Sequence, residues 1–233
     1  MLGVWVNGFA VIAGGALGCL LRGGLKEKYS QTINYGLALC VIIIGIGGAL
    51  KSGDTLAMIV SVVAGTMIGE WLRIEDGINR LGDWAQSKLA KGDTGFAVGF
   101  VNASLLFCVG AMAVVGSLEA GLQNKPDTLL AKAMLDGVFS VILASSYGPG
   151  VMLSALPLTL YQGGIALLSG VLAPLLTESL INEMSAVGSL LIIGIGVNSL
   201  GCLKERIRVG NMLPAIALPC AWLPLAAWVR SLL

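Results

Sequence analysis

The sequence contains no histidine, and only 12% of its residues are charged. Soluble domains carry about 25% charged residues, so this composition argues against a soluble protein. The lack of histidine excludes histidine-ligated zinc, histidine proton relays and the usual hydrolytic triads. A net charge of +1 gives no basic surface suited to nucleic acid. We therefore expect no catalytic residue, no cofactor and no nucleic-acid partner.

The five cysteines are isolated, and no two form a CxxC pair. Each one lies in an apolar run, where a free cysteine behaves as a small buried hydrophobe. Metal and redox sites draw on paired cysteines. We therefore predict no metal site.

The apolar residues make up 56% of the chain and gather in runs of about 20 residues, the length that crosses a bilayer as a helix. The sequence thus predicts an all-α polytopic membrane protein with one integral domain over residues 1–233. We expect about eight transmembrane helices, with seven as the alternative. The predicted spans cover residues 4–21, 32–50, 55–72, 96–118, 129–146, 157–176, 184–202 and 212–229.

Residues 74–93 differ from these runs because apolar side chains alternate with charges at helical spacing. This pattern is typical of an amphipathic helix on the membrane surface. A short helix folded against its own bundle is the alternative.

The basic residues gather on one side of the eight-span arrangement. The loops after odd-numbered spans hold ten of the 14 Lys and Arg residues, and the remaining four lie on the other side or within spans. Positive loops face the cytoplasm. This bias predicts that both termini are non-cytoplasmic.

An internal repeat relates the two ends of the chain. The segment NGFAVIAGGAL (7–17) matches QGGIALLSGVL (162–172), IIIGIG (42–47) matches LIIGIG (191–196), and EWLR (70–73) matches AWVR (227–230). Because an odd number of spans separates the copies, repeats 1–73 and 157–233 would have opposite orientations around central helices in 94–156. Inverted repeats are typical of secondary transporters. Chance matching of glycine-rich apolar segments is the alternative.

The stretch from Ala133 to Gly164 combines an apolar composition with an ionisable residue and a Gly-Pro-Gly break. Irregular backbone in a membrane is tolerated where it lines a cavity or is buried in protein. Gly148 can therefore expose helix ends to a solute or ion. Residues 151–156 form either a re-entrant half-helix or an extension of the sixth span, and a plain tight turn is the alternative for the break.

Asp136 is the strongest candidate for a solute or ion path, because an intramembrane carboxylate is costly. Ser140 lies one turn deeper on the same helix face, and Ser145 adds a further oxygen nearby. Lys132 lies one turn shallower and is expected to be a structural charge partner. The pair therefore serves either to neutralise two charges or to handle a cation or proton.

Four amides complete the candidate path: Asn7, Asn102, Gln162 and Asn198. Interhelical hydrogen bonds explain each amide taken alone. Asn7 and Gln162 occupy equivalent places in the two repeats, which favours a shared position facing one site.

The runs NASLLFCVGAMAVVGSLEAGL (102–122) and LDGVFSVILASSYGPGVMLSALPLTLYQGG (135–164) resemble the YqgA/YdfK-type family of uncharacterised bacterial inner-membrane proteins, sometimes described as transporters. The resemblance covers the whole chain and implies a bacterial plasma-membrane location. It supplies no substrate and no site residues. We expect a secondary transporter of a small solute or ion in the lipid bilayer; a channel-like pore and a non-transporting scaffold are the alternatives, and homo-oligomerisation is left open.

Overall fold

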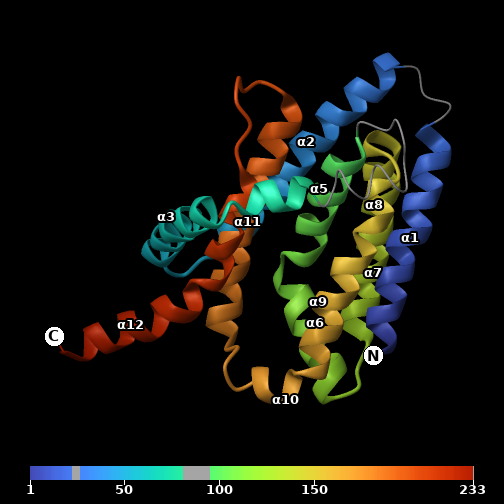
Figure 1. Cartoon of the computed structure of the whole chain (residues 1–233). Helices are drawn as coiled ribbons and strands as arrows, with labels where there is room; N and C mark the ends of the chain where they lie inside the picture. Colours follow the sequence, from blue (N-terminus) through green and yellow to red (C-terminus); the bar gives the residue numbers. More distant parts are fainter. Residues whose placement is uncertain (23–26, 81–94, 233) are drawn as a thin grey trace. The chain divides into compact units, whose positions relative to one another are not determined.

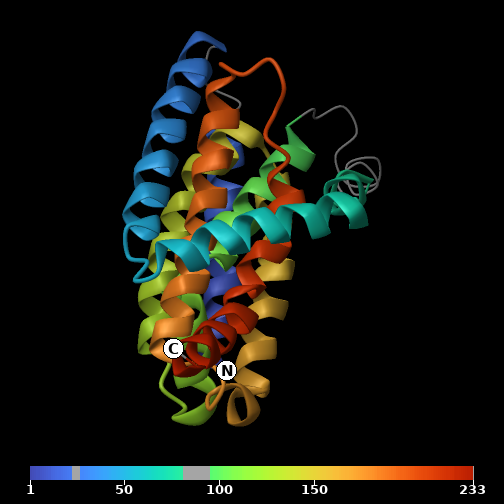
Figure 2. The same cartoon turned by 90° about the vertical axis from the view of Figure 1, so that its left-hand side faces the viewer.

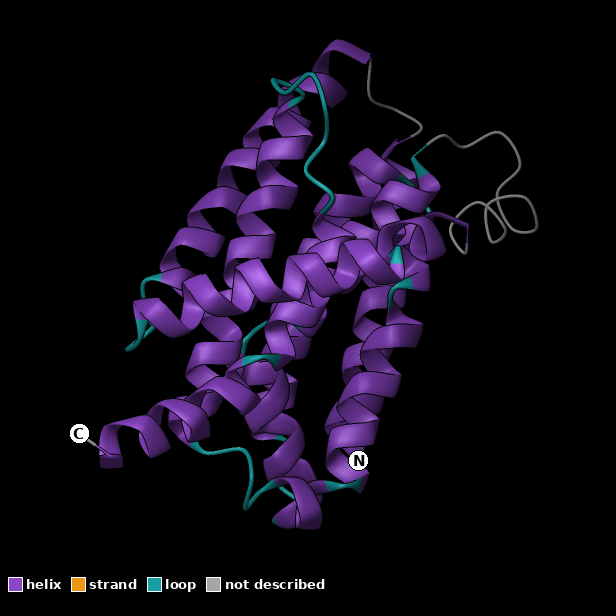
Figure 3. Cartoon of the chain, turned by 60° about the vertical axis from the view of Figure 1, so that its left-hand side comes forward, coloured by secondary structure: helices purple, strands orange, loops and turns teal. Residues whose placement is uncertain are grey.

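The computed structural model describes residues 1–22, 27–80 and 95–232, and all regular structure in these ranges is helical (Figure 3). This confirms the predicted all-α class for the described part of the chain. The helices, in chain order, are α1 (Leu2–Arg22), α2 (Glu27–Ala49), α3 (Thr55–Leu72), α5 (Phe96–Cys108), α6 (Ala111–Leu122), α7 (Asp127–Tyr147), α8 (Gly150–Leu153), α9 (Ala155–Leu167), α10 (Ser169–Leu172), α11 (Glu178–Leu200), the 3-10 helix η1 (Val209–Ala217) and α12 (Pro219–Leu232).

Five helical segments in the described residues are long and apolar enough to cross a membrane, and six if α5 and α6 form one broken span. Large apolar side chains face outward on these helices. Phe9 of α1 is 71% exposed, and Trp71 of α3 is 82% exposed. Exposed apolar surface on this scale suits contact with lipid rather than water.

The fourth predicted span, 96–118, is divided into two helices. The N–H of Val109 bonds the carbonyl of Leu105 at the end of α5, and Gly110 then adopts a φ of 130°. A side chain rarely tolerates this conformation, so glycine sets the break. The two helices meet at a bend of 62°.

The Gly-Pro-Gly segment forms a sharp turn between α7 and α8. Gly148, with φ 81°, ends α7, and Pro149 precedes the first residue of α8. Residues 150–167 then form one apolar helical segment of 18 residues. Residues 151–156 therefore belong to the same helical segment as the start of the predicted sixth span.

Proline divides the last predicted span, 212–229. Pro214 lies inside η1, and Pro219 begins α12. A proline lacks the N–H that continues an α-helix, and the helix type changes here from 3-10 to α.

The chain forms two compact units, the first of which contains residues 1–37 and 79–175. Here α1 lies along α7 (Figure 1). A Cβ at Gly14 would overlap the carbonyl of Gly137, and one at Gly18 would overlap the carbonyl of Val141. Glycine thus allows the two backbones to approach closely. The contact moves toward the C-terminus of both helices, from Gly14 and Gly137 to Gly18 and Val141, so the two helices are parallel.

Helix α9 packs on another part of α1 through a paired contact. A Cβ at Gly8 would overlap Thr159, and one at Gly163 would lie 3.8 Å from Val4. Thr159 follows Val4 by 155 residues, and Gly163 follows Gly8 by 155 residues. The same separation relates Asn7 to Gln162. The two helices are antiparallel, and their contact is approximately two-fold symmetric.

The second unit contains residues 38–78 and 176–233. In it, α3 runs across α11 (Figure 2). The face of α3 that carries glycines packs on η1: Gly65 lies against Ala215, and Gly69 lies against Asn211.

The second half of α2 packs on α11 with a symmetry like that of α1 and α9. A Cβ at Gly45 would approach Ser189 O and Ile193 N, and one at Gly196 would approach Ala38 O and Ile42 N. Gly196 follows Gly45 by 151 residues, and Ser189 follows Ala38 by the same separation. The same backbone atoms therefore meet each glycine.

The predicted amphipathic segment 74–93 is described only as far as residue 80, and the rest lies outside the described residues. Residues 74–80 are helical; Ile74, Glu75 and Ile78 are half-buried, and the other four residues are exposed. The Glu75 carboxylate accepts a bond of 2.7 Å from Gly210 N at the start of η1. Glu75 therefore anchors the start of this segment on η1, within the second unit.

Candidate functional site

A buried ion pair lies on α7 in the first unit. The Lys132 ammonium donates to both oxygens of Asp136, at 2.9 Å and 2.8 Å. The two residues are one helical turn apart and share a face. Both are buried, with exposures of 7% and 5%. Lys132 and Asp136 therefore form the ion pair that their spacing predicts.

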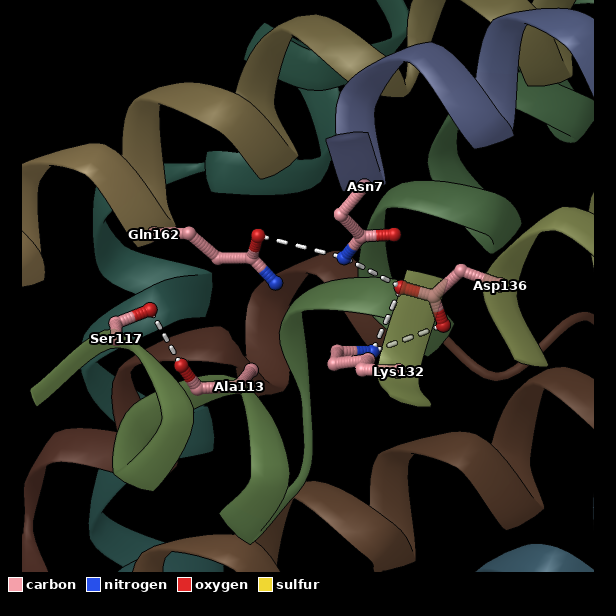
Figure 4. Close-up of polar contacts among 6 residues, drawn as sticks. All are labelled: Asn7, Ala113, Ser117, Lys132, Asp136 and Gln162. Carbon is pink, nitrogen blue, oxygen red and sulfur yellow. Dashed lines mark hydrogen bonds and ion pairs between the residues drawn. The ribbon is translucent and has the colours of Figure 1, made fainter. Parts of the chain in front are cut away.

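Asn7 of α1 connects this ion pair to α9 (Figure 4). Its Nδ2 donates to Asp136 Oδ2 at 2.9 Å and to Gln162 Oε1 at 3.3 Å. Asn7 and Gln162 are both fully buried. The structure thus brings together three residues from three helices that the sequence analysis selected separately.

Close helix approach places Asn7 in this position. Three glycines of α1 face α7: Gly3 lies about one turn before Asn7, and Gly14 and Gly18 lie about two and three turns after it. Gly8 faces α9. Small residues at such contacts let polar side chains on neighbouring helices reach one another. The polar site therefore depends on the glycine-rich sequence of α1.

Three polar atoms at the site have no hydrogen-bond partner within the described protein. They are Asn7 Oδ1, Gln162 Nε2 and Ser140 Oγ, all in fully buried residues. In Figure 4 the dashed line from Asn7 ends on the Gln162 amide oxygen, and no dashed line reaches the Gln162 nitrogen. Each unpaired buried polar group costs about 1–3 kcal/mol. The charges of the site are thus paired, whereas its amides keep free hydrogen-bonding capacity.

Three other residues of the predicted path, Ser145, Gly148 and Asn102, are not among the hydrogen-bonded members of this network (Figure 4). Ser145 is buried, and its hydroxyl donates to Ile142 O within α7 at 2.7 Å. Gly148 forms the turn after α7. Asn102 is half-buried on α5. None of these three takes part in the hydrogen bonds drawn in Figure 4.

Asn198 lies in the second unit, at the end of α11. Its Nδ2 donates to Ile207 O, and its Oδ1 accepts from Ile207 N, each at 2.8 Å. Both ends of the amide therefore hold the loop that follows α11. Its place in a solute path stays a prediction.

Glu183 is a buried acid that the sequence analysis missed. It is 3% exposed and accepts bonds from Ser52 Oγ at 2.7 Å, Gly53 N at 2.6 Å and Asp54 N at 3.1 Å. The predicted seventh span began at residue 184, so Glu183 fell in a loop. The helix cap at Thr177, whose hydroxyl accepts from Leu180 N, was the available signal for the earlier start.

The chemistry of the network follows from its charge balance. Asp136 and Lys132 neutralise each other, and the remaining members are uncharged amides. Among the described residues, no three His, Cys, Asp or Glu side chains gather in a group that could hold a metal ion. The network can therefore exchange hydrogen bonds, and Asp136 Oδ1, which accepts a hydrogen bond from Lys132 alone, has capacity for a further donor.

Comparison with known proteins gives a family and two similar proteins. The YdfK protein of Bacillus subtilis (strain 168), an uncharacterised membrane protein, is 32% identical over 224 residues, which cover 94% of each chain. The uncharacterised protein YqgA of Escherichia coli (strain K12) is 32% identical over 234 residues, covering 98% of this chain and 97% of YqgA. No solved structure matches the chain. The DUF554 profile, described as a protein of unknown function, matches residues 2–223, and the chain therefore belongs to the DUF554 family of uncharacterised proteins.

Proposed function

We propose that this protein is a secondary transporter of a small solute or ion. The observation that carries the proposal is the buried network of Asp136, Lys132, Asn7 and Gln162, which leaves amide and hydroxyl atoms unpaired in an apolar helical unit. Ionisable residues inside membrane helices are rare and usually serve a path for a solute, an ion or a proton. The proposed path contains Asp136, Ser140, Asn7 and Gln162.

The symmetric contacts support the inverted repeats on which this proposal draws. Helix α1 packs antiparallel on α9, its counterpart in the second repeat, at the offset of 155 residues that the sequence match gives. Helix α2 packs antiparallel on α11 at an offset of 151 residues, two more than the match of 42–47 to 191–196. Transporters with inverted repeats place their site between the repeats. The hydrogen bond between Asn7 and Gln162 joins two equivalent positions. We therefore propose that the site lies on the axis that relates the repeats.

Two other functions compete with this proposal. A channel-like pore would pass its solute without coupling to a second gradient. A membrane scaffold would use the network only for stability. A coupled transporter is favoured over a pore because the network is buried, and over a scaffold because Asn7 and Gln162, one from each repeat, keep unpaired amide atoms there. An enzyme is not proposed, since the chain lacks histidine.

The chain is proposed to reside in the bacterial inner membrane with eight spans and both termini outside the cytoplasm. The bias of Lys and Arg toward the loops after odd-numbered spans motivates this arrangement. The parallel packing of α1 and α7, spans one and five, fits it. A periplasm-active reporter fused after Leu233 should be active. Activity of only a cytoplasmic reporter at that position would reject the arrangement.

An experimental structure in lipid that resolves ordered water tests the function of the site. We expect density within hydrogen-bond distance of Asn7 Oδ1 and Gln162 Nε2, because these buried atoms have no protein partner. Water or solute that forms a continuous file from this position to either membrane surface would support transport. A dry, fully packed centre would support the scaffold instead.

A further inference from the structure

The amide of Asn7 has two competing partners, and the atoms left unpaired beside it are complementary. Asn7 Oδ1 is a free acceptor, and Gln162 Nε2 is a free donor. Two amides lying side by side form two hydrogen bonds, N–H to O in each direction. In this structure only one of the two forms, at 3.3 Å, while Asp136 Oδ2 holds the Asn7 nitrogen at 2.9 Å.

The orientation of both amides follows from the carboxylate. Asp136 Oδ2 accepts hydrogen bonds from Lys132 and Asn7, so the Asn7 atom that faces it is the nitrogen. The Gln162 atom that faces the same nitrogen is then the oxygen. Gln162 Nε2 is thereby left without an acceptor, and turning the Gln162 amide around would place two donors against each other.

We propose that Asn7 is a two-position switch: its hydrogen bonds to Gln162 of α9 change when another partner binds Asp136. In the position seen here, Asn7 holds Asp136 and makes one bond to Gln162. In the second position, it releases Asp136 and pairs with Gln162 through both hydrogen bonds. The switch rests on the proposed function for its purpose, because it would couple occupation of Asp136 to the contact between the two repeats.

The two positions are balanced by opposing contributions. A hydrogen bond to a charged carboxylate is stronger than one between neutral groups. The second position instead pairs two buried atoms that are unsatisfied in the first. A solute or ion that takes Asp136 Oδ2 removes the advantage of the first position. Asn7 then has its better partner in Gln162.

A double-mutant cycle between Asn7→Leu and Gln162→Met tests the switch through thermal stability in detergent. The cycle is measured in the natural protein and again in a Lys132→Met/Asp136→Leu background, where the carboxylate is gone and no charge is stranded. The non-additivity of the two changes in Tm should be about twice as large in the second background, because two amide bonds replace one.

Two controls make the cycle decisive. A cycle between Gln162→Met and Ser117→Ala should be equal in both backgrounds, because the Ser117 hydroxyl donates to Ala113 O within α6. If Asp136→Leu prevents folding, Asp136→Ala provides the same loss of acceptor with less volume. Equal or smaller coupling between Asn7 and Gln162 in the second background would overturn the switch. The cycle measures stability alone, so its failure and a failure of transport are separate results.

Discussion

Asp136→Asn should lower the free energy of unfolding by about 3–5 kcal/mol, because it leaves the buried Lys132 ammonium without a counter-charge. The neutral amide still offers an oxygen to Asn7, so the loss comes from the charge rather than from the hydrogen bond between α1 and α7. The measurement is a thermal melt of the purified protein in detergent. It should show a large fall in Tm.

Adding Lys132→Met should recover most of this stability, because it removes the stranded charge. Asp127→Asn is the matched control, since it changes an exposed acid in the first turn of the same helix. It should cost less than about 1 kcal/mol, the usual size of a charge effect at a helix N-terminus. A melt of Asp136→Asn equal to that of the natural protein would contradict the buried ion pair, as would a double variant that stays as unstable as the single one.

Local signals in the sequence were sufficient to predict several helices closely. The third span, 55–72, coincides with α3, because Asp54 caps its start and charged residues follow its end. The spacing of Lys132 and Asp136 fixed their pairing once a helix was assumed. The repeat alignment also gave Asn7 and Gln162 equivalent positions, and these residues are hydrogen-bonded in the structure.

Features that depend on one backbone angle or on distant partners escaped the sequence analysis. The run VGAMAVVGS is apolar throughout, so nothing in its periodicity marks the break that Gly110 makes. Glu183 is buried because residues 52–54, far away in the chain, supply its hydrogen bonds. Asn198 similarly depends on a loop nine residues later. Hydrophobic periodicity reveals neither a single backbone angle nor the hydrogen-bond partners of a side chain.

The Lys132→Met/Asp136→Asn double variant is also expected to lose transport completely while remaining folded. If Asp136 served only to neutralise Lys132, replacing both would remove the problem and its solution together, and activity would return with stability. If Asp136 receives a cation, a proton or a polar solute, no neutral amide replaces its charge. The double variant should therefore be stable but inactive, whereas the natural protein is stable and active and Asp136→Asn alone is unstable.

Ion flux in proteoliposomes tests this separation most directly. Vesicles containing the natural protein, the double variant or Asp127→Asn receive mixtures of amino acids, sugars and small carboxylates, and internal pH and sodium are followed with fluorescent dyes. We expect solute-evoked flux with the natural protein and with Asp127→Asn, and only the signal of empty vesicles with the folded double variant. Flux through the double variant as fast as through the natural protein would contradict the role proposed for Asp136.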